Sequence, residues 1–243
     1  MEVFNNTTKI VKDDLEKVIT PRSRISIAAA SFSIYAYEEL KKQLNSIESL
    51  RFIFTAPTFV AEKIPKEKRE FYIPRLNRER SIYGTEFEVK LRNELTQKAI
   101  ARECAEWIRN KVTFKSNATN DSMGGFLNVQ SDNQEYTYMP LNGFTTVDIG
   151  CERGNNIYNM VNKFEAPFSK EYIRLFESIW KDDERLQDVT EEVIEYISAV
   201  YQENSPELLY FMTLYNIFSE FLEDISEDVL PNEATGFKDS VIW

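Results

Sequence analysis

The chain has 243 residues, a formal net charge of −11, 42% hydrophobic and 28% charged residues, two cysteines and no histidine. No stretch approaches the run of about 18 apolar residues that a membrane helix needs, and the missing histidine excludes imidazole nucleophiles, Ser–His and Cys–His pairs and histidine-bound zinc. Two cysteines and an amino terminus without a signal-peptide core predict a cytoplasmic protein with no membrane partner.

The first half of the chain predicts alternating helices and strands. Apolar residues recur with helical spacing in some stretches and alternate in others, with short polar connections between them. In chain order we expect a helix over 8–20, a buried strand over 25–30, a helix through Leu40 and Leu44, a strand over 50–54, a helix over 86–111 and a strand over 111–115. A strand, helix and strand with short connections predict a right-handed parallel unit.

The second half predicts a hairpin and then helices. After a polar loop over 116–125, we expect strands over 125–130, 136–141 and 144–150, and helices over 169–180, from Asp188 and from Ser205. The expected fold class is therefore α/β, with a mixed, mainly parallel sheet, helices on both faces and an α-helical extension. The expected divisions are an α/β domain over 1–166, the extension over 167–230 and a linker over 231–243.

The order of these elements resembles a phospholipase D-type domain over roughly residues 20–190. The stretch "ISIAAASFS" is similar to the first strand of the family, "LRFIFTAPTF" to the second, and "YIRLFESIW" to a helix that ends in tryptophan. The segment "SMGGFLNVQ" resembles the strand that carries the His-x-Lys motif of the family. The segment "PLNGFTTVDIG" resembles the polar motif that follows it.

The resemblance implies a domain that has lost its catalytic groups. Gly124 stands in place of the histidine and Phe126 in place of the lysine, while Asn142, Thr145 and Asp148 are the polar residues left in the second motif. The family reaction needs a histidine nucleophile, a second histidine as acid, and lysines on the phosphate. We therefore expect no catalytic residues and no bound metal or other cofactor in this chain.

The end of the chain resembles a second group of proteins. The stretch "FMTLYNIFSEFLED…LP…TGFKDSVIW" is similar to the junction in bacterial Snf-type superfamily-2 DEAD/DEAH helicases, where an amino-terminal phospholipase D-like domain leads into the motor. The stretch from Arg78 to Asn117 resembles the same proteins. This implies that Trp243 is a boundary inside a larger protein, whose missing motor would bind ATP and Mg²⁺ and would be a partner of this domain.

Charge is spread unevenly along the chain. Residues 61–115 contain 14 Lys and Arg against 9 Asp and Glu, whereas residues 165–243 contain 5 against 19. Arginine and lysine with nearby aromatic residues suit phosphate contacts, so the basic stretch is a candidate DNA-binding face. The same composition also suits a basic loop that pairs with the acidic helices. The candidate DNA-binding residues are Arg75, Arg78, Arg80, Lys90 and Arg92.

Three functions follow from these observations. The first is a non-catalytic accessory domain of a DNA helicase or translocase, for DNA engagement or partner recognition. The second is a protein–protein docking module without nucleic-acid contact, favoured by the acidic carboxyl-terminal extension and by the helix expected from Ser205, which is apolar on most sides. The third is a Mg²⁺-dependent nuclease that uses the E-x-K pair Glu88 and Lys90. A homodimer is compatible with the resemblance, because single-motif relatives pair two sites, but a chain without a catalytic site does not require one.

Overall fold

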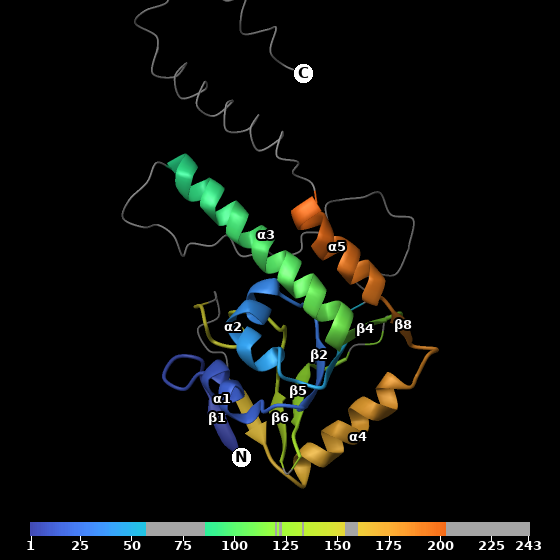
Figure 1. The fold of residues 1–243 in the computed structure, drawn as a ribbon. Coiled ribbons are helices and arrows are strands. Elements are labelled where there is room, and N and C mark those ends of the chain that lie inside the picture. Colours follow the sequence, from blue (N-terminus) through green and yellow to red (C-terminus); the bar gives the residue numbers. More distant parts are fainter. Residues whose placement is uncertain (57–85, 120, 122, 133, 154–159, 203–243) are drawn as a thin grey trace, which may run out of the picture.

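The computed structural model describes residues 1–56, 86–119, 121, 123–132, 134–153 and 160–202, with the backbone alone for 86–95 and 202. The described residues form an eight-stranded mixed sheet with helices on both faces (Figure 1). The helices are α1 (Val11–Val18), α2 (Ile34–Leu44), α3 (Glu86–Lys111), α4 (Phe168–Trp180) and α5 (Thr190–Gln202). The strands are β1 (Glu2–Phe4), β2 (Arg24–Ala29), β3 (Ser49–Phe54), β4 (Val112–Asn117), β5 (Phe126–Gln130), β6 (Glu135–Met139), β7 (Val161–Phe164) and β8 (Leu186–Asp188).

The sheet has the order β1-β7-β6-β5-β2-β3-β4-β8. Only β3 has parallel neighbours on both sides, β2 and β4, and the other five of the seven pairings are antiparallel. The predicted α/β class with a mixed sheet is confirmed, but the prediction of a mainly parallel sheet is wrong. The physical reason lies in the connections, because the four residues 131–134 can join β5 to β6 only as a hairpin, whereas parallel neighbours need a crossover of about a dozen residues.

Most of the predicted elements are present. The parallel unit of β2, α2 and β3 is confirmed, and α3 has the limits predicted for it. The helix predicted from Asp188 is present as α5, and the carboxylate of Asp188 accepts a hydrogen bond from the amide of Thr190, its first residue, at 2.9 Å. Three strands were not predicted. Strands β1, β7 and β8 contain three or four residues each, which is too few for an alternating pattern.

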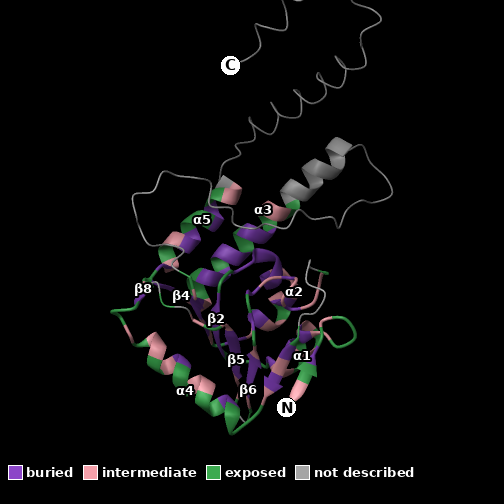
Figure 2. Ribbon diagram, turned by 180° about the vertical axis from the view of Figure 1, so that it is seen from behind, coloured by how far each residue is buried: buried purple, intermediate pink, exposed green. Residues whose placement is uncertain are grey.

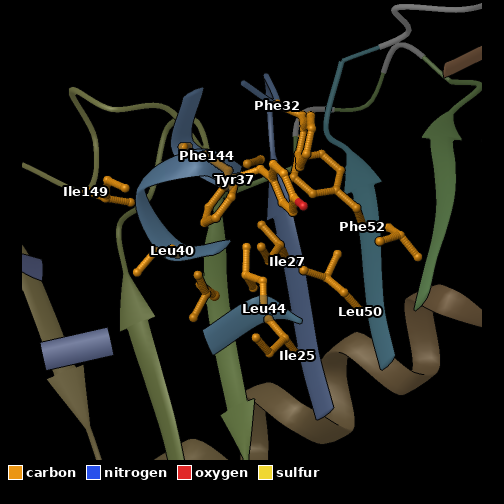
Figure 3. Close-up of a cluster of buried hydrophobic side chains, with 14 of the residues drawn as sticks. Ile25, Ile27, Phe32, Tyr37, Leu40, Leu44, Leu50, Phe52, Phe144 and Ile149 are labelled. Atoms are coloured by element: carbon orange, nitrogen blue, oxygen red, sulfur yellow. The ribbon is translucent and has the colours of Figure 1, made fainter. Parts of the chain in front are cut away.

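The main core lies on one face of the sheet, beneath α1, α2, α3 and α5 (Figure 3). Alternate residues of the central strands supply it, such as Ile25 and Ile27 of β2. Phe32 packs edge-on against Phe52 and Phe114, with ring centroids 5.8 and 5.3 Å apart. Edge-to-face aromatic contacts of this kind stabilise a core beyond the burial of their area.

The opposite face of the sheet is covered by α4 and is more polar. Its cluster of fully buried apolar residues is small and comprises Ala28, Ile53, Phe126, Phe176 and Leu186. Charged residues fasten the helix as well. Arg51 forms an ion pair with Glu177, and its guanidinium lies 5.2 Å from the Phe176 ring centroid. The ammonium of Lys115 donates to the carbonyl oxygen of Trp180 at 3.0 Å, at the carboxyl end of α4, where a cation is favoured.

The predicted α-helical extension over 167–230 is described as far as residue 202. This part contains α4, which covers the sheet, β8, which pairs with β4, and α5, which packs beside α3 (Figure 1). Residues 203–230 and the predicted linker over 231–243 lie outside the described residues. The division of the chain at residue 166 stays a prediction.

A buried ionic cluster fixes α1 to the sheet. The ammonium of Lys163 in β7 lies 2.7 Å from the carboxylate of Asp14 in α1, with side-chain exposures of 7% and 16%. The hydroxyl of Tyr138 in β6 donates to the same carboxylate at 2.5 Å. Lys163 also lies 4.2 Å from the ring centroid of Tyr136. The charges are desolvated, so the cluster is stable only while both partners are present.

We expect Lys163→Met to lower the free energy of unfolding by about 3 kcal/mol, because it leaves the Asp14 carboxylate buried without its cation. Urea denaturation of the two proteins measures the difference. Lys9→Met is the matched control, since the pair of Lys9 and Glu2 is 44% exposed and its loss should cost less than about 1 kcal/mol. Equal effects of the two variants would contradict the assignment.

The attachment of α4 should weaken in acid. The hydrogen bond from Arg51 lowers the pKa of Glu177 from its ordinary value of 4.5. When the pKa of a carboxyl group is lower in the folded chain than in the unfolded chain, its ionised form stabilises the fold. This stabilisation is complete at pH values above the unfolded-state pKa and is lost as the pH falls through the folded-state pKa. We therefore expect the stability difference between the unmodified chain and Glu177→Gln to disappear between about pH 5 and pH 3 in urea titrations. Glu171→Gln, whose pair with Arg174 is exposed, should show no such trend.

Candidate functional site

The candidate site is the edge of the sheet at which the three parallel strands end. Strands β2, β3 and β4 run in one direction, so Ala29, Phe54 and Asn117 terminate at the same edge, and the antiparallel β5 begins there at Phe126. In open α/β sheets, ligands bind outside the carboxyl ends of the strands. Three connecting segments meet at this edge: 30–33, 118–125 and 140–150.

Backbone hydrogen bonds fasten segment 140–150 to the end of β2. The amide of Ala30 donates to the carbonyl oxygen of Asn142 at 2.8 Å, and Phe144 and Ser31 are linked in the same way at 2.8 Å. The amide of Ser33 donates to the carbonyl oxygen of Phe144 at 3.0 Å. Ser33 also caps α2, because its hydroxyl accepts a hydrogen bond from the amide of Tyr35.

Residues 144–150 form turns and not a strand, so the strand predicted over this range is wrong. A single isolated bridge joins Phe32 to Phe144. Beyond it, the amide of Asp148 donates to the Thr145 hydroxyl at 3.2 Å, and the amide of Ile149 donates to the Thr145 carbonyl oxygen. A Thr or Asp side chain that bonds to nearby backbone competes with a strand ladder, and here the local bonds prevail.

Asp148 is a half-buried carboxyl group whose hydrogen bonds are local. The Thr145 hydroxyl donates to it at 2.5 Å, and the backbone amide of Gly143 also donates to it. Burial raises the pKa of Asp148, while these two hydrogen bonds act in the opposite direction. A side chain on Gly143 would lie 2.5 Å from the Ser31 hydroxyl and 2.7 Å from the Asp148 carboxylate, so the absent Cβ lets these groups approach. Asp148 therefore organises the loop.

The two positions that the resemblance compares with His-x-Lys have different surroundings. Gly124 is exposed, and a Cβ at this position would have none of the described atoms within 4 Å. Phe126 is 4% exposed and lies in the cluster beneath α4, with its ring 5.5 Å from that of Tyr172 and 6.3 Å from that of Phe176. The structure thus brings Gly124, Asn142 and Asp148 to the edge of the sheet, whereas the side chain of Phe126 belongs to the core.

A polar turn after β4 also lies at this edge, and its residues are not among the predicted site residues. The buried side chain of Asn117 donates to the carbonyl oxygens of Thr55 and Asp121, at 3.1 and 2.9 Å. Its own carbonyl accepts hydrogen bonds from the amide and hydroxyl of Thr119. Asn followed two residues later by Thr, directly after a strand, is the signal that could have identified this Asx-type turn.

The predicted basic residues are only partly covered by the structure. Arg75, Arg78 and Arg80 lie outside the described residues, and for Lys90 and Arg92 only the backbone of α3 is described. The E-x-K pair of Glu88 and Lys90 also lies in α3. Residues two apart in a helix point about 200° away from each other, because each turn contains about 3.6 residues.

No protein-family model matches the chain, and a search of curated proteins found no significant relative. Among the residues that the structure describes, no group of three or more Cys, Asp or Glu is placed to hold a metal ion. None of the described helices combines the length and the apolar character needed to cross a membrane.

Gly125 and Gly124 provide a matched test of the packing at this edge. A Cβ on Gly125 would overlap the carbonyl oxygen of Leu141 and lie 3.1 Å from that of Ala28, both of which are backbone atoms. We therefore expect Gly125→Ala to cost more than about 2 kcal/mol in urea denaturation, and Gly124→Ala to be almost neutral. A tolerated Gly125→Ala would contradict this packing.

Proposed function

We propose that the chain is a non-catalytic accessory domain of an ATP-dependent DNA helicase or translocase, and that it engages the DNA substrate. The observation that carries the non-catalytic part is the surroundings of Gly124 and Phe126. The first has no side chain at the exposed edge, and the second is enclosed in the apolar cluster beneath α4. Neither can act as a nucleophile or hold a phosphate.

The rest of the edge supports the same proposal. Phosphoryl transfer through a covalent intermediate needs a strong nucleophile and a group that donates a proton to the leaving oxygen. The Asp148 carboxylate is held by hydrogen bonds from Thr145 and Gly143. The chain contains no histidine that could act as the nucleophile or as the proton donor. Of the other described polar side chains at the edge, the Asp121 carboxylate pairs with Arg185, and the rest are amides and hydroxyls, which can bind polar groups but are weak nucleophiles.

The assignment to a helicase or translocase rests on the resemblance of the tail and of the stretch from Arg78 to Asn117 to Snf-type proteins. In this proposal ATP and Mg²⁺ bind in the motor, which would be the main partner of the domain. The domain would hold DNA, or a protein on DNA, while the motor hydrolyses ATP. Its own contribution is then to affinity and coupling and not to bond cleavage.

A docking module without nucleic-acid contact is the second candidate, and the outer side of α4 favours it. Phe168 and Leu175 are 65% and 47% exposed and lie seven residues apart, which places them on the same side of the helix. Most of α4 is exposed or of intermediate burial (Figure 2). Exposed apolar residues grouped in this way are typical of contacts between proteins. The third candidate is a nuclease in which the Glu88 carboxylate would help to hold Mg²⁺ and the Lys90 ammonium would position the attacking water. Both groups would have to reach one centre, which their spacing on α3 disfavours.

A binding and cleavage experiment on the purified chain tests the proposal. We expect affinity for single-stranded, duplex or forked DNA that falls steeply as salt increases, because phosphate contacts release counterions. We also expect no cleavage of phosphodiesters, with or without Mg²⁺. The absence of binding at low salt would favour the docking module. Cleavage that Glu88→Ala or Lys90→Ala abolishes would establish the nuclease.

The link to a motor has a separate test. If the chain is part of such a motor protein, sequencing of the gene should show that the reading frame continues past the codon for Trp243 into a GxxxxGK[ST] phosphate-binding loop. A stop codon at that point would remove the helicase assignment and leave a free-standing binding domain.

A further inference from the structure

The proposed function leaves open which described residues would contact DNA, and the α4 face of the sheet offers a set. Arg24, Arg51 and Lys115 come from β2, β3 and β4 and lie on one face. In the sheet register Arg24 is opposite Ser49, two residues before Arg51. Likewise Arg51 is opposite Thr113, two residues before Lys115. Consecutive members of this diagonal row are therefore separated by about 8 Å between Cα atoms, from a strand spacing of about 4.8 Å and a rise of about 3.3 Å per residue.

Lys181, directly after α4, joins this row to form what we call the α4 cation cluster, which comprises Arg24, Arg51, Lys115 and Lys181. Arg51 hydrogen-bonds to Glu177, and Lys181 follows Glu177 by four residues, about one helical turn. The charges of Arg51, Lys181 and Arg24 all lower the pKa of Glu177. Lys115 pairs with Asp183 at 2.7 Å. The cluster thus contains four cations against two paired carboxylates, in a chain whose net charge is −11.

The four cations do not have the same role. Arg51 and Lys115 are mostly buried, with side-chain exposures of 27% and 15%, and they hold α4 through Glu177, Asp183 and the ring of Trp180. Arg24 and Lys181 are exposed, and no described residue forms a hydrogen bond or ion pair with the side chain of either. The attachment of α4 therefore does not account for Arg24 and Lys181.

We propose that the α4 cation cluster is a contact surface for the phosphate backbone of single-stranded DNA, with Arg24 and Lys181 as its exposed members. This rests on the proposed function. Arg24 and Lys181 come from two different elements beside the buried Arg51 and Lys115, and positive charge spread in this way fits an extended chain of phosphates better than a single small anion. Such contacts are independent of base sequence and depend on salt. Glu177 acts against binding, because its negative charge lies among the same cations.

The test uses the complete 243-residue chain and a labelled oligothymidylate, with anisotropy titrations over a series of salt concentrations. Single-strand contacts each contribute about 0.7 to the slope of log affinity against log salt, so Arg24→Gln/Lys181→Gln should lower the slope by about 1.4. Arg102→Gln/Arg174→Gln removes the same charge from exposed pairs on α3 and α4 and should change the slope less. Glu177→Gln should raise the affinity for the oligothymidylate, because it removes a negative charge from beside the cations. The glutamine carbonyl can still accept a hydrogen bond from Arg51, so α4 should stay attached.

Each outcome separates the two proposals. If the unmodified chain binds and the two double variants have equal slopes, the α4 cation cluster is not the contact surface, but DNA engagement stands. If the unmodified chain does not bind at low salt, both fail. If polyglutamate displaces the oligothymidylate at equal charge concentration, the surface recognises acidic proteins instead, and the assignment to DNA is overturned.

Discussion

The sheet changes its direction of pairing at β2, and both the core and the candidate site depend on this change. Strand β2 pairs in parallel with β3 and antiparallel with β5. Its residues from Ile25 to Ala29 are all buried, which fixes the strand between the main core and the layer of α4. Because β5 starts where β2 ends, the connections before β5 and after β6 are brought to one edge. The loops that carry Gly124, Asn142 and Asp148 are therefore neighbours as a result of strand direction alone.

The two faces of the sheet are held by different forces. The face beneath α2, α3 and α5 is a continuous apolar core whose aromatic rings interlock. Among the described residues, the face beneath α4 has a smaller cluster of five buried apolar residues with partly buried apolar neighbours, and Arg51 and Lys115 add charged contacts to it. Local stability follows the density of apolar contacts, so α4 should open more readily than the other helices. The exposed cations and the exposed Phe168 and Leu175 all border this less firmly held layer.

Helices and strands were predicted correctly from the sequence where their apolar pattern was long enough. The prediction failed where the structure depended on strand direction or on contacts with distant residues. The alternation in β3 and the length of α3 located these elements correctly. The direction of β5 is not contained in its own residues, and only the short connection to β6 could indicate it. Residues 144–150 alternate as a strand would, but Thr145 and Asp148 bond to each other and close a turn. At the site, no sequence pattern indicated that the side chain of Phe126 turns into the α4 layer, or that Asn117 organises the loop after β4.

Because the side chain of Phe126 is enclosed, residues 124 and 126 would differ in how well they tolerate a side chain that binds phosphate. A Cβ at residue 124 would meet none of the described atoms within 4 Å, so a larger side chain can be introduced there with little change to the described fold. A lysine at residue 126 would instead place an ammonium against Tyr172 and Phe176, with no carboxylate described beside it. Such a burial costs several kcal/mol, which is a large share of the stability of a domain. The packing of α4 against Phe126 would therefore oppose a phosphate-binding side chain at this position, and a variant that carried one would have to repack that helix.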